Sequence, residues 1–144
     1  MPPPLRHRRM PAATPSRLVL IAEDNSDTRF LYAAYFLLQG WKVQAAEDGE
    51  IVIARARESL PDIIVMDLAM PHLDGWKATR RLKKDQRTAH IPVVACTAHA
   101  FGRPVEDALD AGCDAYIVKP CLPEDLFREV NAVLTRSTRR QRNG

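Results

Sequence analysis

The feature that most constrains this sequence is an alternation between short apolar runs and longer segments with helical spacing. The apolar runs have the length and the aliphatic content that are typical of buried strands. They cover residues 18–22, 41–45, 62–66, 92–96 and 115–118. The segments with helical spacing, several of which end at glycine or in basic residues as helices commonly do, cover residues 26–39, 50–59, 75–84, 105–111 and 123–135.

Five such strand–helix repeats predict an α/β fold with a parallel sheet, because parallel strands need crossover connections and the crossing helices cover both faces. A chain of 144 residues is too short for an eight-stranded barrel. We therefore expect a doubly wound, five-stranded parallel sheet with helices on both faces. Its binding site should lie at the carboxyl ends of the strands.

Composition sets the expected domain boundaries. Residues 1–17 are rich in proline and arginine and contain no acidic residue, so we expect a disordered basic extension. Residues 18–135 form the expected domain, and residues 136–144 a short basic tail. Residues 18–135 hold all 18 acidic residues but 13 of the 21 basic ones, so their net charge is −5 although the whole chain carries +3.

Several classes of protein are disfavoured. No apolar run approaches the roughly 20 residues of a membrane span, and residues 1–17 lack the apolar segment of a signal peptide. Cys96, Cys113 and Cys121 form no CxxC pair, so neither a disulfide framework nor a zinc site is indicated. The residues after the last helix are too few for a DNA-binding domain. We expect a cytoplasmic protein that binds neither membrane nor nucleic acid.

Polar residues stand where the strands end. Glu23 and Asp24 follow the first run, Asp67 the third, Thr97 the fourth and Lys119 the fifth. Three carboxylates about 5 Å apart repel by roughly 3 kcal/mol per pair, and a hard cation such as Mg²⁺ relieves this repulsion. The bound metal would leave one Asp67 oxygen free to attack phosphorus. Lys119 would neutralise part of the charge on the phosphoryl oxygens, and the Thr97 hydroxyl with adjacent backbone N–H groups would bind them.

This set of residues resembles the receiver domain of two-component response regulators, in particular stand-alone receivers and those attached to hybrid kinases. The resemblance covers about residues 17–135. It rests on Glu23-Asp24-Asn25, VMDLAMPHLDG at residues 65–75, Thr97-Ala98 and GCDAYIVKP at residues 112–120. It implies a flavodoxin-like (βα)5 fold and a signalling phosphoacceptor that catalyses only its own phosphorylation and dephosphorylation. The implied phosphodonor is a histidine kinase or a histidine phosphotransfer protein.

The resemblance also implies a metal site. Asp67 becomes the phosphoacceptor. Asp24 and Asp67 bind Mg²⁺, or Mn²⁺, directly, Glu23 binds it through water, and the backbone carbonyl of Ala69 is a further ligand.

The phosphoryl group and the switch are assigned in the same way. The backbone N–H groups of Ala69 and Ala98 bind the phosphoryl group together with Lys119, which pairs with Asp67 beforehand. Thr97 and Tyr116 form the switch, and the Lys119–Pro120 peptide bond is cis. The signal then leaves by protein contact or onward relay, from a monomer or a weak, phosphorylation-dependent dimer.

Other interpretations remain open. Asp24 alone could cap the following helix. A phosphohydrolase with an aspartate nucleophile would carry a second acid at the position of Ala69, and a receiver-like module that is never phosphorylated would not need the full set of site residues. The first helix is apolar well beyond one stripe. It is either a core helix with a few exposed aromatic residues or, as the resemblance implies, a docking face for the phosphodonor, with Tyr32 as an outward aromatic residue.

Overall fold

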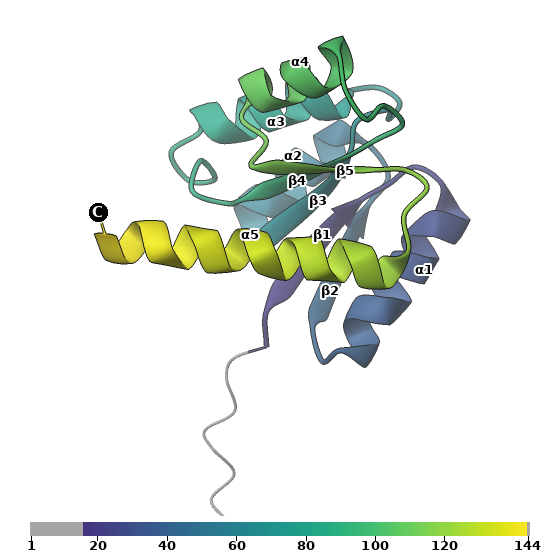
Figure 1. Ribbon diagram of the computed structural model, residues 1–144, viewed down its shortest axis with the longest axis vertical. Helices are drawn as coiled ribbons and strands as arrows, with labels where there is room; N and C mark the ends of the chain where they lie inside the picture. The colour runs from purple at the N-terminus through teal and green to yellow at the C-terminus, as the bar shows by residue number, and fades with distance from the viewer. Residues whose placement is uncertain (1–15, 144) are drawn as a thin grey trace, which may run out of the picture.

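The computed structural model describes residues 16–143, and within that part five strands alternate with five helices (Figure 1). The strands are β1 (Leu18–Ala22), β2 (Lys42–Ala46), β3 (Ile63–Asp67), β4 (Val93–Thr97) and β5 (Ala115–Val118). The helices are α1 (Ser26–Leu38), α2 (Gly49–Ser59), α3 (Gly75–Lys84), α4 (Arg103–Ala111) and α5 (Pro123–Asn143). Of the expected N-terminal extension, residues 1–15 lie outside the described residues.

The strands form one parallel sheet in the order β2-β1-β3-β4-β5. The predicted doubly wound, flavodoxin-like α/β fold is therefore confirmed. The chain winds outward from β1 to β2 on one side and from β3 to β5 on the other, which creates the switch in strand order where such sheets bind ligands. In the register, Ala22 lies opposite Met66 and Asp67 opposite Cys96. The residues that follow β1 and end β3 thus lie at the same edge.

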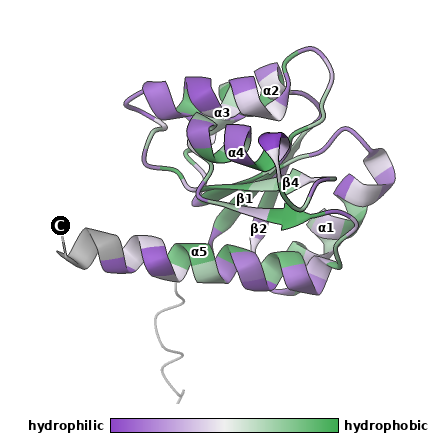
Figure 2. Ribbon diagram, turned by 45° about the horizontal axis from the view of Figure 1, so that its top comes forward, coloured by the Kyte–Doolittle hydropathy of each residue, from purple (hydrophilic) through white to green (hydrophobic). Residues whose placement is uncertain are grey.

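The sheet separates two hydrophobic cores, because successive residues of a strand point to opposite faces. Val19 and Ile21 contribute to the core under α1 and α5, whereas Leu20 contributes to the core under α2, α3 and α4. Figure 2 shows hydrophobic residues along the strands and hydrophilic residues on the helices that cover them. With both faces covered, every residue of β3 and β4 is buried.

Three strands lie one residue later than predicted: β2, expected over residues 41–45, β3 and β4. β3 includes Asp67 and β4 includes Thr97, where we expected strands over residues 62–66 and 92–96. The apolar pattern stops at these two polar side chains, but the backbone ladder continues, since the N–H of Leu68 donates to the carbonyl of Cys96 at 3.1 Å. The two polar residues are therefore held by sheet hydrogen bonds and not by a loop.

The last helix is longer than predicted. We expected it to end near residue 135 and the remainder to be a short basic tail, but α5 continues to Asn143. Arginine and glutamine favour helix, and the hydroxyls of Thr135 and Thr138 donate to the carbonyls of Asn131 and Leu134 one turn earlier. Composition alone does not separate a basic tail from a basic helix. No described helix, α5 included, is both long and apolar enough to cross a membrane.

Candidate functional site

The predicted site residues converge on a cleft at the carboxyl edge of the sheet. The cleft has a volume of about 380 Å³ and lies beside the switch in strand order. Its lining includes every residue expected to contact metal or phosphoryl group: Glu23, Asp24, Asp67, Ala69, Thr97, Ala98 and Lys119. Four of the five strands thus contribute to one site.

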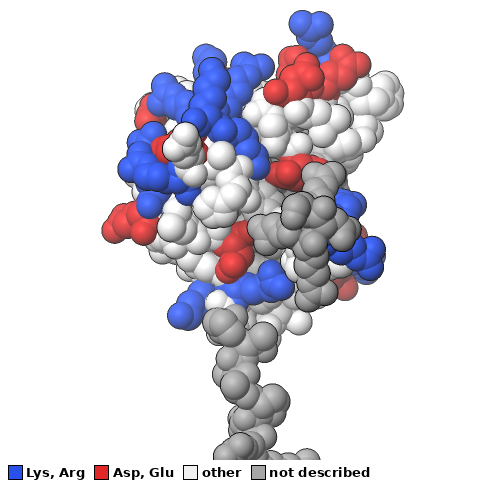
Figure 3. All heavy atoms as spheres, turned by 90° about the vertical axis from the view of Figure 1, so that its left-hand side faces the viewer, with Lys and Arg blue, Asp and Glu red and all other residues white. Residues whose placement is uncertain are grey.

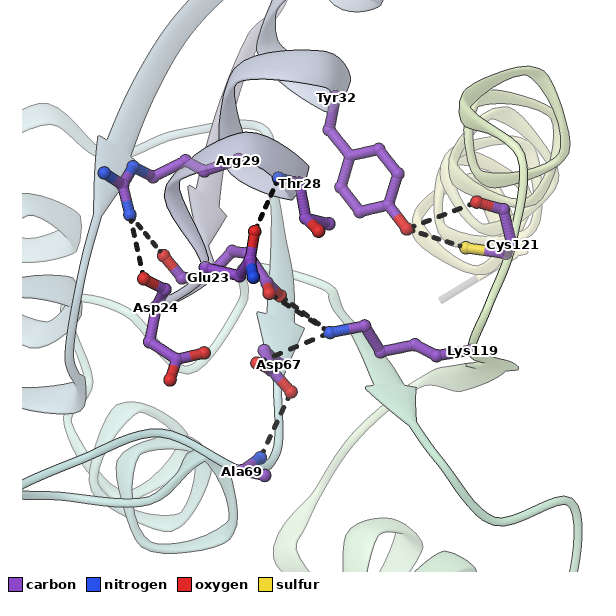
Figure 4. Close-up of polar contacts among 10 residues, drawn as sticks. Glu23, Asp24, Thr28, Arg29, Tyr32, Asp67, Ala69, Lys119 and Cys121 are labelled. Atoms are coloured by element: carbon purple, nitrogen blue, oxygen red, sulfur yellow. Dashed lines mark hydrogen bonds and ion pairs between the residues drawn. The ribbon is translucent and has the colours of Figure 1, made fainter.

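Three carboxylates form the acidic part of the site. Glu23, Asp24 and Asp67 each place one carboxylate oxygen within 4.8 Å of the other two. Glu23 and Asp67 are buried, with 2% and 5% of their surface exposed, whereas Asp24 is exposed. Figure 4 shows the side chains of all three around the same space. Closely spaced carboxylate oxygens of this kind suit a hard divalent cation such as Mg²⁺.

Lys119 provides the opposing charge. Its Nζ lies 3.0 and 3.1 Å from the two carboxylate oxygens of Glu23 and 3.6 Å from Oδ2 of Asp67. Lys119 therefore pairs with Asp67 as expected but contacts Glu23 more closely. Burial alone lowers the pKa of Lys119, but the hydrogen bonds to Glu23 and the charges of Asp67 and Glu23 raise it above its usual value. The lysine stays protonated and balances one of the buried negative charges.

The surroundings of Asp67 disfavour its ionised form. Burial, followed by the negative charge of Glu23, raises the pKa of Asp67 to about 7, although Lys119 acts in the opposite direction. The backbone N–H of Ala69 donates to Asp67 Oδ1 at 3.2 Å. Ionisation of Asp67 is therefore costly without a further cation.

Thr97 and Tyr116 lie on neighbouring strands but differ in exposure. Thr97 is buried at the end of β4, and its Oγ1 accepts the N–H of His99 at 3.1 Å. Tyr116 is 38% exposed, and its hydroxyl donates to the carbonyl of Ala100 at 3.4 Å. The phenol is therefore directed outward and is tied to the loop that follows Thr97.

The turn after β1 corrects one alternative interpretation. Asn25, and not Asp24, caps α1, because its Oδ1 accepts the N–H of Thr28 at 2.9 Å. The Asp24 carboxylate is not used for capping and remains at the cleft. On the opposite side of the cleft, the Lys119–Pro120 peptide bond is cis, the isomer that the resemblance implies.

Two residues of the site region were missed by sequence reasoning. Trp76 lines the cleft and donates from Nε1 to the carbonyl of Pro104 at 3.1 Å, which links α3 to the start of α4. Arg29 lies next to the turn that carries Glu23 and Asp24. Its spacing was a usable signal, because a residue one helical turn after the Asn25 cap is directed back over the start of the helix.

Comparison with known proteins identifies the family. The protein-family model described as the response regulator receiver domain matches residues 19–131. The chain belongs to the response regulator receiver family. Receiver domains take part in two-component signal transduction and are typically phosphoacceptors that are not enzymes.

Two relatives illustrate how this receiver compares with whole proteins. It is 35% identical over 116 residues to protein PilH of Pseudomonas aeruginosa, a match that covers 81% of this chain and 96% of PilH. It is 36% identical over 121 residues to the DNA-binding dual master transcriptional regulator RpaA of Synechocystis, covering 84% of this chain. The match spans only half the length of RpaA.

A solved structure bears on the metal. The receiver domain of the sensor histidine kinase PA1611 from Pseudomonas aeruginosa superposes with a TM-score of 0.77 at 29% identity, over 83% of this chain and 98% of that one. In that structure a magnesium ion is coordinated in the active-site cleft. The acidic triad of Glu23, Asp24 and Asp67 is similar to such receiver magnesium sites.

Proposed function

We propose that this receiver accepts a phosphoryl group on Asp67 from a phosphohistidine, in a reaction that depends on Mg²⁺ or Mn²⁺. The observation that carries the proposal is the placement of Asp67. Its carboxylate is buried at the end of a central strand, within 4.8 Å of two further acids and 3.6 Å from a lysine ammonium. One lysine ammonium faces two buried carboxylates, and excess buried charge is destabilising. This arrangement therefore favours an incoming cation, which in turn can offset the charge of a phosphoryl group.

The chemical step follows from the groups in the cleft. An Asp67 oxygen forms a bond to phosphorus while the bond from phosphorus to the donor imidazole nitrogen breaks, and the electron pair stays on that nitrogen. The product is an acyl phosphate on Asp67. Lys119, the Thr97 hydroxyl and the backbone N–H groups of Ala69 and Ala98 bind the phosphoryl oxygens, whose charge grows during transfer.

The metal site is assigned to the same residues. Asp24, Asp67 and the backbone carbonyl of Ala69 would hold the ion directly, and Glu23 would hold it through water. Bound there, it would supply positive charge to the phosphoryl oxygens. Lys119 would then exchange its close contact with Glu23 for one with the phosphoryl group.

We further propose that the phosphodonor docks on α1. Phe30, Leu31, Leu37 and Leu38 are all more than half exposed along one side of this helix, with Leu38 at 83%. Such a stripe suits the apolar face of a helical partner. Tyr32, which we expected to face outward, is buried at 3% exposure, and its hydroxyl contacts Cys121. The outward aromatic residue is instead Phe30, which is 76% exposed.

Phosphorylation of the domain must be passed on as a signal. We propose that the domain, in which α5 continues beyond residue 135, signals by protein contact or passes the phosphoryl group onward, with Thr97 and Tyr116 as the switch. Ala69 disfavours a phosphohydrolase, since its methyl group cannot act as the second acid. The complete acidic triad with Lys119 disfavours a module that is never phosphorylated.

The test is phosphorylation of the full chain by a small acyl-phosphate donor with Mg²⁺, followed by intact mass. Wild type should gain one phosphoryl group and Asp67→Asn none. Asp110→Asn, which removes an exposed carboxylate on α4, is the matched control and should be modified like wild type. Modification of Asp67→Asn at the wild-type rate would overturn the assignment.

A further inference from the structure

Arg29 holds the turn that carries two of the three acids. Its Nη1 donates to the backbone carbonyl of Glu23 at 2.8 Å and approaches the carbonyl of Asp24 at 3.4 Å (Figure 4). The Arg29 side chain is 19% exposed; its contact with the Glu23 carbonyl is partly buried, whereas its contact with the Asp24 carbonyl is exposed. The arginine touches the backbone of both acids and leaves their carboxylates to the cleft.

These contacts matter because adjacent residues of an extended chain direct their side chains to opposite sides. Glu23 and Asp24 nevertheless bring both carboxylates into one cluster. The backbone must therefore curl between them, and two successive carbonyls that approach one Arg29 nitrogen are the sign of that curl. The guanidinium charge offsets the two carbonyl dipoles, which would otherwise disfavour this conformation.

Other groups hold Glu23 in the turn, whereas Arg29 contacts the backbone of Asp24. The N–H of Glu23 donates to the carbonyl of Ala46 at 3.0 Å, and Lys119 orients the Glu23 side chain. Asp24 is exposed, and Arg29 contacts it through the backbone carbonyl alone. Arg29 also lies 3.8 Å from Glu47, but the Glu47 side chain is 71% exposed, and such surface pairs contribute little.

We propose that Arg29 is a positioning residue for the metal site, which fixes the directions of Glu23 and Asp24 through their backbone carbonyls. The inference rests on the proposed function, since it concerns the ion that these carboxylates would bind. It adds a residue that contacts neither metal nor phosphoryl group. Outer contacts of this kind typically change metal affinity by about 10–100-fold.

The test is calorimetric titration of the metal-free full chain with Mg²⁺. Arg29→Lys keeps the positive charge, but the lysine side chain ends one bond short of the position of Nη1 and should not reach both carbonyls, so its Kd for Mg²⁺ should rise about tenfold. Glu47→Gln removes the ion pair and keeps the carbonyl contacts, so its Kd should stay within about twofold of wild type. Urea unfolding without metal reports the stability of each protein separately.

A kinetic measurement separates positioning from general damage. Phosphorylation of Arg29→Lys by the small donor should require about tenfold more Mg²⁺ for half-maximal rate but reach the wild-type rate at saturating Mg²⁺. A purely structural role would lower the unfolding midpoint and leave the Mg²⁺ dependence of the folded protein unchanged. If Arg29→Lys is partly unfolded, the titration is made in trimethylamine N-oxide, which favours the folded state.

The outcomes are distinct. Wild-type Mg²⁺ affinity in Arg29→Lys, or an equal loss in Glu47→Gln, overturns the role of Arg29 while leaving the proposed function intact. If wild type itself binds no Mg²⁺, the metal site of the proposed function fails, whatever the variant does.

Discussion

Asp67 carries an electrostatic cost in the metal-free protein. Its pKa is raised from 3.8 in the unfolded chain to about 7 in the fold, first by burial and then by Glu23. Between these two values the folded protein binds more protons than the unfolded chain, so the free energy of unfolding falls as pH rises. The contribution is therefore unfavourable above about pH 7 and absent below about pH 4.

Replacing Asp67 by Asn removes this cost. We expect Asp67→Asn to be more stable than wild type by about 1–3 kcal/mol near pH 8 in EDTA, and the difference to shrink toward pH 4. Urea unfolding at several pH values measures this. Asp110→Asn, at an exposed site, should show no comparable gain. A gain for Asp67→Asn that does not change with pH would contradict the electrostatic explanation.

At the residue scale, sequence reasoning predicted which side chains meet but not all of their contacts. Asp67, Thr97 and Lys119 follow from strand ends that share an edge. The closer contact of Lys119 with Glu23 joins residues 96 positions apart and depends on side-chain reach that no local pattern encodes. Tyr32 was misplaced because a helix that is apolar on nearly every side does not reveal which side is buried.

At the scale of single elements, α1 offers a direct test of donor docking. We expect Phe30→Glu to slow phosphotransfer from a phosphohistidine protein at least about tenfold, because it places a charge in the apolar stripe. Phosphorylation by a small acyl-phosphate donor should be unchanged, since the cleft is untouched. The two rates are compared on the same protein preparation.

The control is Leu109→Glu, which adds the same charge at a half-exposed leucine on α4. It should leave both rates unchanged. If Phe30→Glu and Leu109→Glu slow the phosphohistidine reaction equally, or if the small-donor rate of Phe30→Glu falls in parallel, α1 is not the docking face.

The end of α2 stores backbone strain. Leu60 terminates the helix with φ 47° and ψ 65°, a left-handed conformation that costs a residue with a Cβ roughly 1–2 kcal/mol. Its side chain is 52% exposed, so little burial is lost on truncation. We expect Leu60→Gly to raise the free energy of unfolding by about 0.5–1 kcal/mol. Leu60→Ala keeps the Cβ and should show no gain in the same urea experiment; equal effects of the two would exclude strain as the cause.

Element boundaries show what periodicity does and does not contain. α3 and β5 were predicted to the residue, because basic residues in the last turn mark the end of α3 and polar residues bound the apolar run of β5. The end of α5 was missed by eight residues, because an arginine-rich sequence is compatible with both a solvated tail and an exposed helix. Glycine and proline would have marked the difference, and neither occurs between Pro123 and Asn143.

At the scale of the whole molecule, five repeats were enough to predict the sheet, because right-handed crossovers and burial on both faces leave few topologies. Charge is also unevenly distributed within the folded part, which the composition of the chain did not reveal. Lys77, Arg80, Arg81 and Lys84 are exposed on α3, and Asp110 is exposed on α4. Figure 3 shows a group of basic side chains and, apart from it, a group of acidic ones on the same view. Asymmetry thus exists within the folded part and not only between the fold and its ends.

The two tryptophans of the chain lie on opposite sides of the sheet. Trp76 lines the cleft and packs on the core of α2 and α3, whereas Trp41 is buried in the other core, with its ring edge-on to Phe36 at 5.2 Å. The protein therefore contains one tryptophan beside the cleft and a second one that the sheet separates from it. Metal binding in the cleft and the proposed phosphorylation of Asp67 should therefore change the intrinsic fluorescence of Trp76, with Trp41 as an internal reference.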